Sequence, residues 1–371
     1  MGIWKITRLL AFLILLGIAV GAACLWYYIS RETEPVLRPI NQEYVNYSHV
    51  PQKAAGLYLE PFSFTGWDGT EIPAVLAVKA GEESSRQLTV SAELARHKAE
   101  ELRKIDYVLV CVDWDHGIRS ALPLAESLTA AGLTCVLWEP RGKNDVRTYC
   151  THGLQESRDV PLLLNALRER STTDDLTIIG VGQGFGADMM LQAAAVEPRL
   201  NGIISIDAYT SLRHSVERLM PPTGLRLITL TLIDLRIKHE VGFESFNVAP
   251  VESASYIKRE VPVLVVNLEQ DNPARMLEDA LGIYSRLPVD CKEVWTLRNA
   301  GDLPQATQRI VSFTSGKNDS KVDEIPVSLL DSREDAMPSI IRWMNDIMIP
   351  AIEAPHIPTP ERPTLSPDSR F

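Results

Sequence analysis

The pattern of hydrophobic residues begins with one long apolar run near the start of the chain. Leu9–Ile29 contains 21 residues and no charged side chain. About 20 apolar residues are enough to cross a bilayer as a helix. Lys5 and Arg8 precede the run, so the positive-inside rule predicts a cytoplasmic stub at 1–8. The rest of the chain is then expected on the outer side of the membrane, as the folded part of a single-pass protein.

Two other interpretations of this run stay open. A secretory signal peptide has a shorter apolar core of about 7–15 residues, and cleavage near Gly21–Ala23 would leave an apolar new start. The sequence that ends at Cys24 resembles a lipoprotein cleavage box, although Gly21 stands where a larger aliphatic residue is usual. The aromatic residues at 26–28 fit the belt that marks a membrane–water interface. We therefore expect an uncleaved anchor at 9–29, with the membrane as its partner.

Polar and proline-rich segments flank a long middle part. Residues 30–52 are polar and contain three prolines, and residues 350–371 contain six. Such segments lack the apolar periodicity of a packed element and form spacers or disordered chain. We expect a linker at 30–52 and a disordered tail at 350–371. About 300 residues, 53–349, remain for one folded domain.

Strand-like and helix-like periods alternate within residues 53–349. Two β-prone runs flank Trp67-Asp68-Gly69, and Asp-Gly between such runs predicts a hairpin. Tyr107–Val112 is wholly apolar, as expected for a strand that is covered on both faces. Further strands are expected at 134–138, 176–181, 203–207, 261–267 and 292–298, and helices at 121–131, 155–170, 185–196, 276–287 and 338–348. This alternation predicts an α/β protein whose mostly parallel sheet has helices on both faces, with ligands at the carboxyl ends of the strands.

Composition and charge narrow the function classes. Hydrophobic residues make up 45% of the chain and charged residues 23%, which is usual for a globular protein. The formal net charge of −11 argues against a nucleic-acid partner, because binding to phosphates needs a basic face. None of the five cysteines forms a CxxC pair, and no His, Cys and carboxylate residues have metal-site spacing. We therefore expect no metal and no cofactor.

One of the predicted strands runs into a glycine-rich turn with the frame of a nucleophile elbow. In the G-x-S-x-G elbow, a serine lies at the sharp turn between a strand and a helix. The chain has Gly182-Gln183-Gly184-Phe185-Gly186 at this place. The outer glycines permit a sharp turn with close contact between strand and helix. The middle residue, which normally supplies the attacking oxygen or sulfur, is Gly184.

In this context the chain resembles the α/β-hydrolase fold over nearly all of residues 53–349. Four further motifs carry the resemblance to a bacterial esterase and serine-peptidase branch of that fold. They are Asp115-His116-Gly117 for the oxyanion loop, Glu139-Pro140-Arg141-Gly142 for an Asp-x-Arg-Gly loop, Gly153, Glu156 and Asp159 for a G-x-x-E-x-x-D stretch, and Pro262–Val265 for a Pro-containing strand. The resemblance implies an oxyanion-loop role for His116 and Gly117, beside the elbow residues.

The same resemblance implies a degenerate catalytic triad. A triad needs a serine or cysteine nucleophile, a histidine base and a carboxylate that orients the base. The matching positions are Gly184 for the nucleophile, Asp271 for the acid and Asp302 for the base. Only the acid is retained, so no intact set of catalytic residues is expected. The resemblance therefore favours a pseudo-hydrolase with a binding or scaffolding role.

Two alternatives to this role stay open. An unconventional esterase or peptidase-like hydrolase would use relocated groups after the next strand: Ser205, Asp207, Ser211 and His214. A dinucleotide-binding protein would use the sequence from Gly182 to Ala187 as G-x-G-x-x-A, with Asp207 about 20 residues later on a ribose hydroxyl.

A binding role leaves two features to explain. The helix that begins at Gly184 offers backbone N–H groups and a positive dipole end, where a small carbonyl or carboxylate ligand would dock without being cleaved. Residues 208–256 form an excursion between strands, where the α/β-hydrolase fold places its lid. Its apolar stretch Leu225–Ile237 is expected to cover the pocket, to touch the membrane beside the anchor or to bind a protein partner that the sequence does not identify.

Overall fold

The computed structural model describes twelve segments of the chain. These are residues 2–37, 53–54, 56–80, 105–111, 118–138, 150–173, 175–219, 226–242, 248–269, 273–298, 328–330 and 333–354. Four residues of the predicted site lie outside them: His116 and Gly117 of the oxyanion loop, and Asp271 and Asp302 of the triad.

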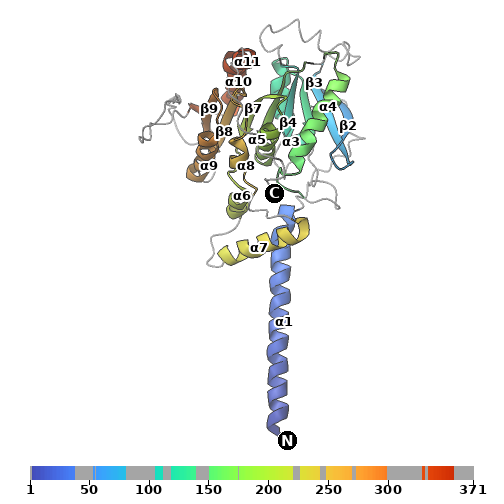
Figure 1. Ribbon diagram of the computed structural model, residues 1–371, viewed down its shortest axis with the longest axis vertical. Coiled ribbons are helices and arrows are strands. Elements are labelled where there is room, and N and C mark those ends of the chain that lie inside the picture. The colour runs from blue at the N-terminus through green and yellow to red at the C-terminus, as the bar shows by residue number, and fades with distance from the viewer. Residues whose placement is uncertain are drawn as a thin grey trace.

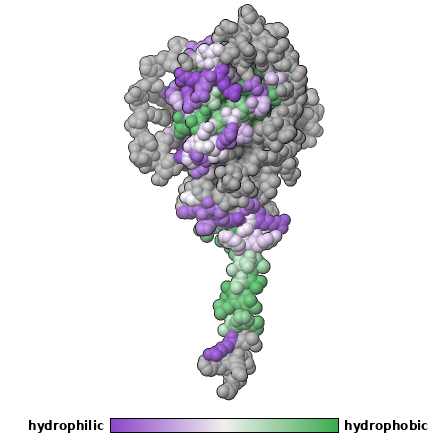
Figure 2. Space-filling view, turned by 90° about the vertical axis from the view of Figure 1, so that its right-hand side faces the viewer, coloured by the Kyte–Doolittle hydropathy of each residue, from purple (hydrophilic) through white to green (hydrophobic). Residues whose placement is uncertain are grey.

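One long helix, α1 (Gly2–Leu37), contains the predicted anchor. Its segment Leu10–Arg31 is long and apolar enough to cross a membrane, and its most apolar stretch is exposed. Figure 1 shows α1 projecting from the folded domain, and Figure 2 shows hydrophobic side chains along its surface. The expected linker begins later than residue 30, because the helix continues to Leu37. The residues after the apolar run include good helix formers, and the first proline, Pro35, comes only in the last turn.

A ten-stranded sheet forms the centre of the folded domain. Its strands are β1 (Lys53–Ala54), β2 (Leu57–Thr65), β3 (Glu71–Lys79), β4 (Tyr107–Cys111), β5 (Cys135–Trp138), β6 (Ile178–Gln183), β7 (Leu200–Ile206), β8 (Val263–Glu269), β9 (Lys292–Arg298) and β10 (Ser328–Leu330). The spatial order is β1-β2-β3-β5-β4-β6-β7-β8-β9-β10. Strands from β5 to β10 pair in parallel, whereas β1, β2 and β3 are antiparallel additions at one edge.

The predicted hairpin joins β2 to β3. The register pairs Thr65 with Glu71, and the turn closes through a hydrogen bond from the Gly66 N–H to the Thr70 carbonyl at 2.7 Å. Gly69 has a φ of 85°, which glycine adopts at little cost. The Asp68 carboxylate accepts the Thr70 N–H at 3.0 Å. The sequence signal for this turn is therefore explained by its local hydrogen bonds.

Helices cover both faces of the sheet, as Figure 1 shows. Within the described segments, the α-helices of the domain are α3 (Ile118–Ala130), α4 (Val160–Arg170), α5 (Phe185–Val196), α6 (Leu212–Leu219), α7 (Arg226–Val241), α8 (Pro250–Ala254), α9 (Pro273–Arg286), α10 (Arg333–Trp343) and α11 (Ile349–Glu353). One buried cluster joins the sheet to α4, α5, α8 and α9, and a second joins its other face to α3, α10 and α11. Two consecutive residues of β4, Leu109 and Val110, belong to different clusters, one on each face of the sheet. The prediction of a strand buried on both faces is confirmed.

The chain remains helical beyond the point where the tail was expected to begin. A π-helical turn, Met344–Met348, leads into α11. Pro350 lies in the first turn of α11, directly after the π-helical turn. The described helix therefore ends at Glu353, and of the expected tail, residues 355–371 lie outside the described segments.

The predicted lid region, 208–256, has two different neighbours. The short helix α8 packs against α5 and α9 and so belongs to the core. The longer helix α7 lies across the upper end of α1, between the domain and the apolar segment, as Figure 1 shows. The apolar stretch that we singled out in the sequence therefore contacts the helix that carries the anchor.

Candidate functional site

The glycine-rich turn predicted from the sequence joins β6 directly to α5. β6 ends at Gln183 and α5 begins at Phe185, so Gly184 alone makes the turn, with φ 54° and ψ −120°. Residues with a side chain rarely adopt this conformation. The Gly184 N–H donates to the Ile206 carbonyl of β7 at 2.8 Å, and the Gly184 carbonyl accepts the Ala187 N–H at 3.0 Å. The turn is thus held by the neighbouring strand and by the first turn of α5.

The outer glycines of the elbow are required by close backbone contacts. A Cβ atom added to Gly182 would lie 2.3 Å from the Gly186 carbonyl oxygen. A Cβ atom added to Gly186 would lie 2.1 Å from the carbonyl oxygen of Cys111, the last residue of β4. Neither distance leaves room for a side chain, so α5 leaves the sheet at a closeness that only glycine permits.

The loop that carries His152 is anchored by a buried carboxylate. Glu156 accepts hydrogen bonds from the Thr151 N–H at 2.7 Å, the Thr151 hydroxyl at 2.5 Å and the Gly153 N–H at 2.9 Å. Burial raises the pKa of the Glu156 carboxyl, although these hydrogen bonds act in the opposite direction. The carboxylate of Asp159 accepts the Trp67 N–H of the hairpin turn at 3.1 Å. The G-x-x-E-x-x-D stretch therefore holds backbone in place.

Polar side chains of α5 fix the two loops beside the elbow. The Gln192 amide donates to the His152 carbonyl at 3.0 Å. The Asp188 carboxylate accepts the Tyr209 N–H, from the loop after β7, at 2.8 Å. The His152 ring meets Phe185 edge-on, with 6.0 Å between the ring centres. The elbow helix thereby positions His152, Phe185 and Tyr209 around one point at the carboxyl edge of the sheet.

A small pocket lies at this point. Its empty space is about 270 Å³ when the part open to solvent is counted, and its enclosed part has room for only about one water molecule. Its wall combines polar residues with apolar ones: His152, Tyr209 and Ser215, and Phe185, Leu212 and Val248. Ser215 and Leu212 come from α6, so the excursion after β7 closes one side of the pocket. The pocket borders the start of α5 without including Gly184 itself.

Three of the four residues considered as relocated catalytic groups serve the fold. The Asp207 carboxylate accepts the Leu268 N–H of β8 at 2.6 Å, and this is also the carboxylate that a dinucleotide ribose would need. The Ser211 hydroxyl accepts the His214 N–H at 3.3 Å, which caps the start of α6. Ser205 is buried within β7, and its hydroxyl has no hydrogen-bond partner among the described residues.

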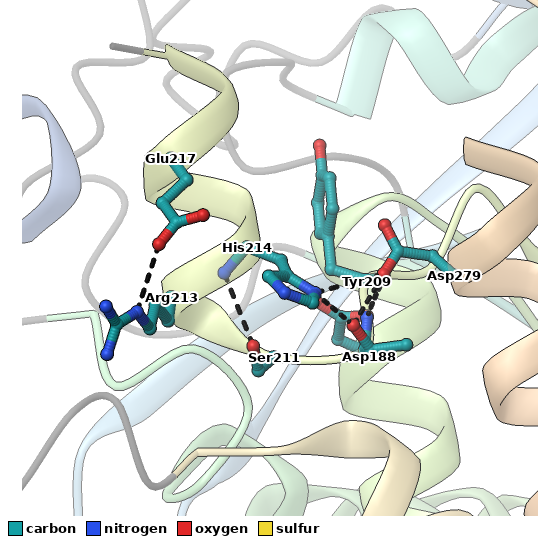
Figure 3. Close-up of polar contacts among 8 residues, drawn as sticks. Asp188, Tyr209, Ser211, Arg213, His214, Glu217 and Asp279 are labelled. Carbon is teal, nitrogen blue, oxygen red and sulfur yellow. Dashed lines mark hydrogen bonds and ion pairs between the residues drawn. The ribbon is translucent and has the colours of Figure 1, made fainter. Parts of the chain in front are cut away.

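His214, the fourth of these residues, pairs with a carboxylate that we did not predict. Figure 3 shows its imidazole directed toward Asp279 of α9. The His214 Nδ1 atom lies 3.4 Å from Asp279 Oδ1 and 2.6 Å from the Thr210 hydroxyl. Thr210 also donates its hydroxyl and its N–H to Asp279, at 2.5 and 3.2 Å. The Thr210 hydroxyl is thus engaged by the carboxylate, so the group is a histidine–carboxylate pair without a directed nucleophile.

A signal for Asp279 was present in the sequence. The predicted helix at 276–287 places Asp279 beside its apolar residues, and the side chain is only 7% exposed. His214 is 56% exposed. A carboxylate on the buried side of a helix needs a partner, which is the argument that would have led to this pair. Among the described residues, no group of three or more His, Cys, Asp and Glu side chains is placed to hold a metal ion.

Comparison with known proteins identifies the fold. No protein-family model and no curated protein matches the sequence. The structure of a Pyrococcus furiosus esterase, Pf2001, superposes with a TM-score of 0.52 at 10% identity, covering 81% of this chain and 96% of the esterase. An acylaminoacyl peptidase from Pyrococcus horikoshii gives a TM-score of 0.49 at 15% identity, covering 80% of this chain and 43% of the peptidase. With its mostly parallel sheet, its helices on both faces and its strand–glycine–helix elbow, the chain has the α/β-hydrolase fold.

Proposed function

We propose that the protein is a membrane-anchored pseudo-hydrolase that binds a ligand without cleaving it. The observation that carries the proposal is Gly184, which occupies the apex of the elbow and has no side chain. Without an attacking oxygen or sulfur, no covalent acyl intermediate forms at this point. Backbone donors alone leave an acceleration that is orders of magnitude below that of an intact triad.

The pocket beside the elbow supports a small carbonyl or carboxylate compound as the ligand. Its enclosed part has room for only about one water molecule, so a ligand would place a single small polar group here. Phe185, in the first turn of α5, lines the pocket and brings it to the positive end of the helix dipole. His152 and Tyr209 supply side chains that form hydrogen bonds. The Asp188 carboxylate also lines the pocket and acts against a negative charge there. These features therefore favour a neutral carbonyl over a carboxylate at the start of α5.

The apolar segment supports a location at the outer face of a membrane. Leu10–Arg31 forms an exposed helix of sufficient length. Lys5 and Arg8 lie on its N-terminal side, which the positive-inside rule assigns to the cytoplasm. The folded domain follows the segment and is therefore extracytoplasmic in this proposal.

Ester turnover by the full-length protein in nanodiscs tests the absence of hydrolysis. We expect p-nitrophenyl acetate and butyrate to be cleaved no faster by the protein than by a heat-unfolded sample. Saturable turnover that one substitution abolishes would overturn the proposal. The complementary variant combines Gly184→Ser with Asp302→His, and gained turnover in that variant would show that the remaining parts of the site persist.

An unconventional hydrolase is the second candidate, and the His214–Asp279 pair favours it. Because Nδ1 faces Asp279 and Thr210, Nε2 on the opposite side of the ring is able to act as a base toward a bound substrate or water. This candidate predicts measurable turnover in the wild-type protein that His214→Ala and Asp279→Asn abolish. The pseudo-hydrolase predicts that these two variants match the wild-type background rate.

A further inference from the structure

Helix α7 contacts α1 near the C-terminal end of its apolar segment. Ile29 and Thr33 of α1 are 4% and 0% exposed, whereas the preceding apolar residues of α1 are exposed. Arg236 of α7 pairs with Glu34 at 3.3 Å, and its guanidinium lies over the Trp26 ring at 5.8 Å. The contact therefore runs from Trp26 to Glu34.

The length of this contact matches a helix that crosses α1. Eight residue steps at about 1.5 Å each span about 12 Å, and a helix with its side chains is about 10–12 Å wide. Figure 1 shows α7 lying across α1, with the folded domain on one side and the apolar part of α1 on the other. The crossing is centred near Arg31, where the candidate span ends. If the span crosses a bilayer whose apolar core is about 30 Å thick, the crossing of α7 over α1 lies at the polar boundary of that bilayer.

The two long faces of α7 differ in what covers them. Leu230, Ile233 and Ile237 are buried. Ile228 and Leu235 are 58% and 62% exposed. At 100° per residue, Ile228 and Leu235 lie on one face of the helix, opposite to the three buried residues. Thr231, Lys238 and His239 are exposed beside Ile228 and Leu235, so this face carries apolar side chains among polar and basic ones. A mixed face of this kind at the end of a span suits a helix that lies in the membrane interface.

We propose that α7 is an interfacial helix that docks on the lipid surface and seats the domain against the membrane. The inference rests on the anchor of the proposed function, since α1 brings α7 to the bilayer boundary. Its partner is the lipid surface on the outer side, with Ile228 and Leu235 inserted below the headgroups. In Figure 1, α6 lies on the same side of the domain as α7. This helix also supplies Leu212 and Ser215 to the wall of the pocket.

Depth-dependent quenching of a fluorophore in nanodiscs tests this docking. The full-length protein carries Cys24→Ala and Cys291→Ala, because these two cysteines are not buried. An environment-sensitive nitrobenzoxadiazole label is then placed on Ile228→Cys or Leu235→Cys. Ile18→Cys is the control within the span, and Val196→Cys, 61% exposed at the far end of α5, is the control in water. Thermal unfolding of each labelled protein confirms that its fold is unchanged.

The result expected is strong quenching of both α7 labels by lipids with a nitroxide near the headgroup. The Ile18 label is quenched by nitroxides deep in the acyl chains, and the Val196 label by neither. If the α7 labels behave like the Val196 label while the Ile18 label is quenched, the docking is refuted and the anchor stands. A blue-shifted α7 label that no lipid nitroxide quenches shows a protein partner or a second copy, and also overturns the proposal. Loss of quenching at Ile18 refutes the anchor and the docking together.

Discussion

The closeness of α5 to the sheet makes Gly186→Ala the sharpest test of the elbow. The added Cβ would lie 2.1 Å from the Cys111 carbonyl oxygen and 2.5 Å from its carbonyl carbon. Reaching 3.4 Å, where ordinary contact begins, requires a displacement of about 1.3 Å. Cys111 is buried and its strand is paired on both sides, so the backbone is unable to retreat without breaking the centre of the sheet.

The expected cost of Gly186→Ala follows from this geometry. Overpacking of a well-packed core costs about 1–3 kcal/mol when side chains give way, and here backbone must move. We expect a loss of about 3 kcal/mol or more in the free energy of unfolding. At roughly 2–4 °C per kcal/mol for domains of 150–250 residues, the Tm falls by about 6–12 °C.

Thermal unfolding of the full-length protein in nanodiscs measures this change. Gly69→Ala is the matched control, because its φ is 85° but nothing lies within 4 Å of the added Cβ. That variant meets only the backbone strain of a left-handed residue, about 1–2 kcal/mol. If the Tm of Gly186→Ala lies within about 1 °C of the Tm of Gly69→Ala, the close approach of α5 to β4, on which the elbow depends, is refuted.

Three further predictions concern charged groups of the folded domain. Because burial raises the pKa of Glu156 above its unfolded value, the folded state holds the proton more tightly, and stability falls as the pH rises from the unfolded pKa through the folded one. Glu156→Gln removes this dependence of the unfolding free energy on pH. It also costs about 1–3 kcal/mol at neutral pH, because buried donors lose their carboxylate acceptor. Urea titrations at several pH values measure the pH dependence and the cost. Burial alone would raise the pKa of Glu197, but the hydrogen bonds and charge of Arg199 lower it; this stabilisation is present above the unfolded pKa and is lost as the pH falls through the folded pKa, a loss that Arg199→Ala reduces at a cost of about 1 kcal/mol, since the backbone N–H of residue 199 still donates to Glu197. Lys292→Met costs about 1–2 kcal/mol in the same assay, because the Lys292 ammonium donates to the carbonyls of residues 284 and 287 at the end of α9.

Local sequence signals predicted most of the sheet. The Asp-Gly turn, the apolar run of β4 and the glycines of the elbow each depend on neighbours in the chain, and each is present in the structure. The limits of α1 were less predictable. In the final turns of α1, Ile29 and Thr33 are buried where α7 packs on this helix. Helix α7 is about 200 residues away in the sequence.

The site was only partly predictable for the same reason. The elbow is a local motif, so the position of Gly184 followed from its spacing. The partner of His214 did not, because Asp279 comes from α9 and meets His214 only when β7 and β8 pair side by side. The roles of Glu156 and Asp188 as holders of backbone also depend on loops brought together by the sheet. His116, Gly117, Asp271 and Asp302 stay predictions.

Covalent labelling of the wild-type protein by a fluorophosphonate tests the central claim most directly. The reagent reports an activated serine through a fixed increase in intact mass, whatever the natural substrate. With Gly184 at the elbow and the Ser205 and Ser211 hydroxyls outside any triad, we predict no adduct on the folded full-length protein. A stoichiometric adduct on one serine, absent after heat unfolding and abolished by replacing that serine with alanine, would contradict the account.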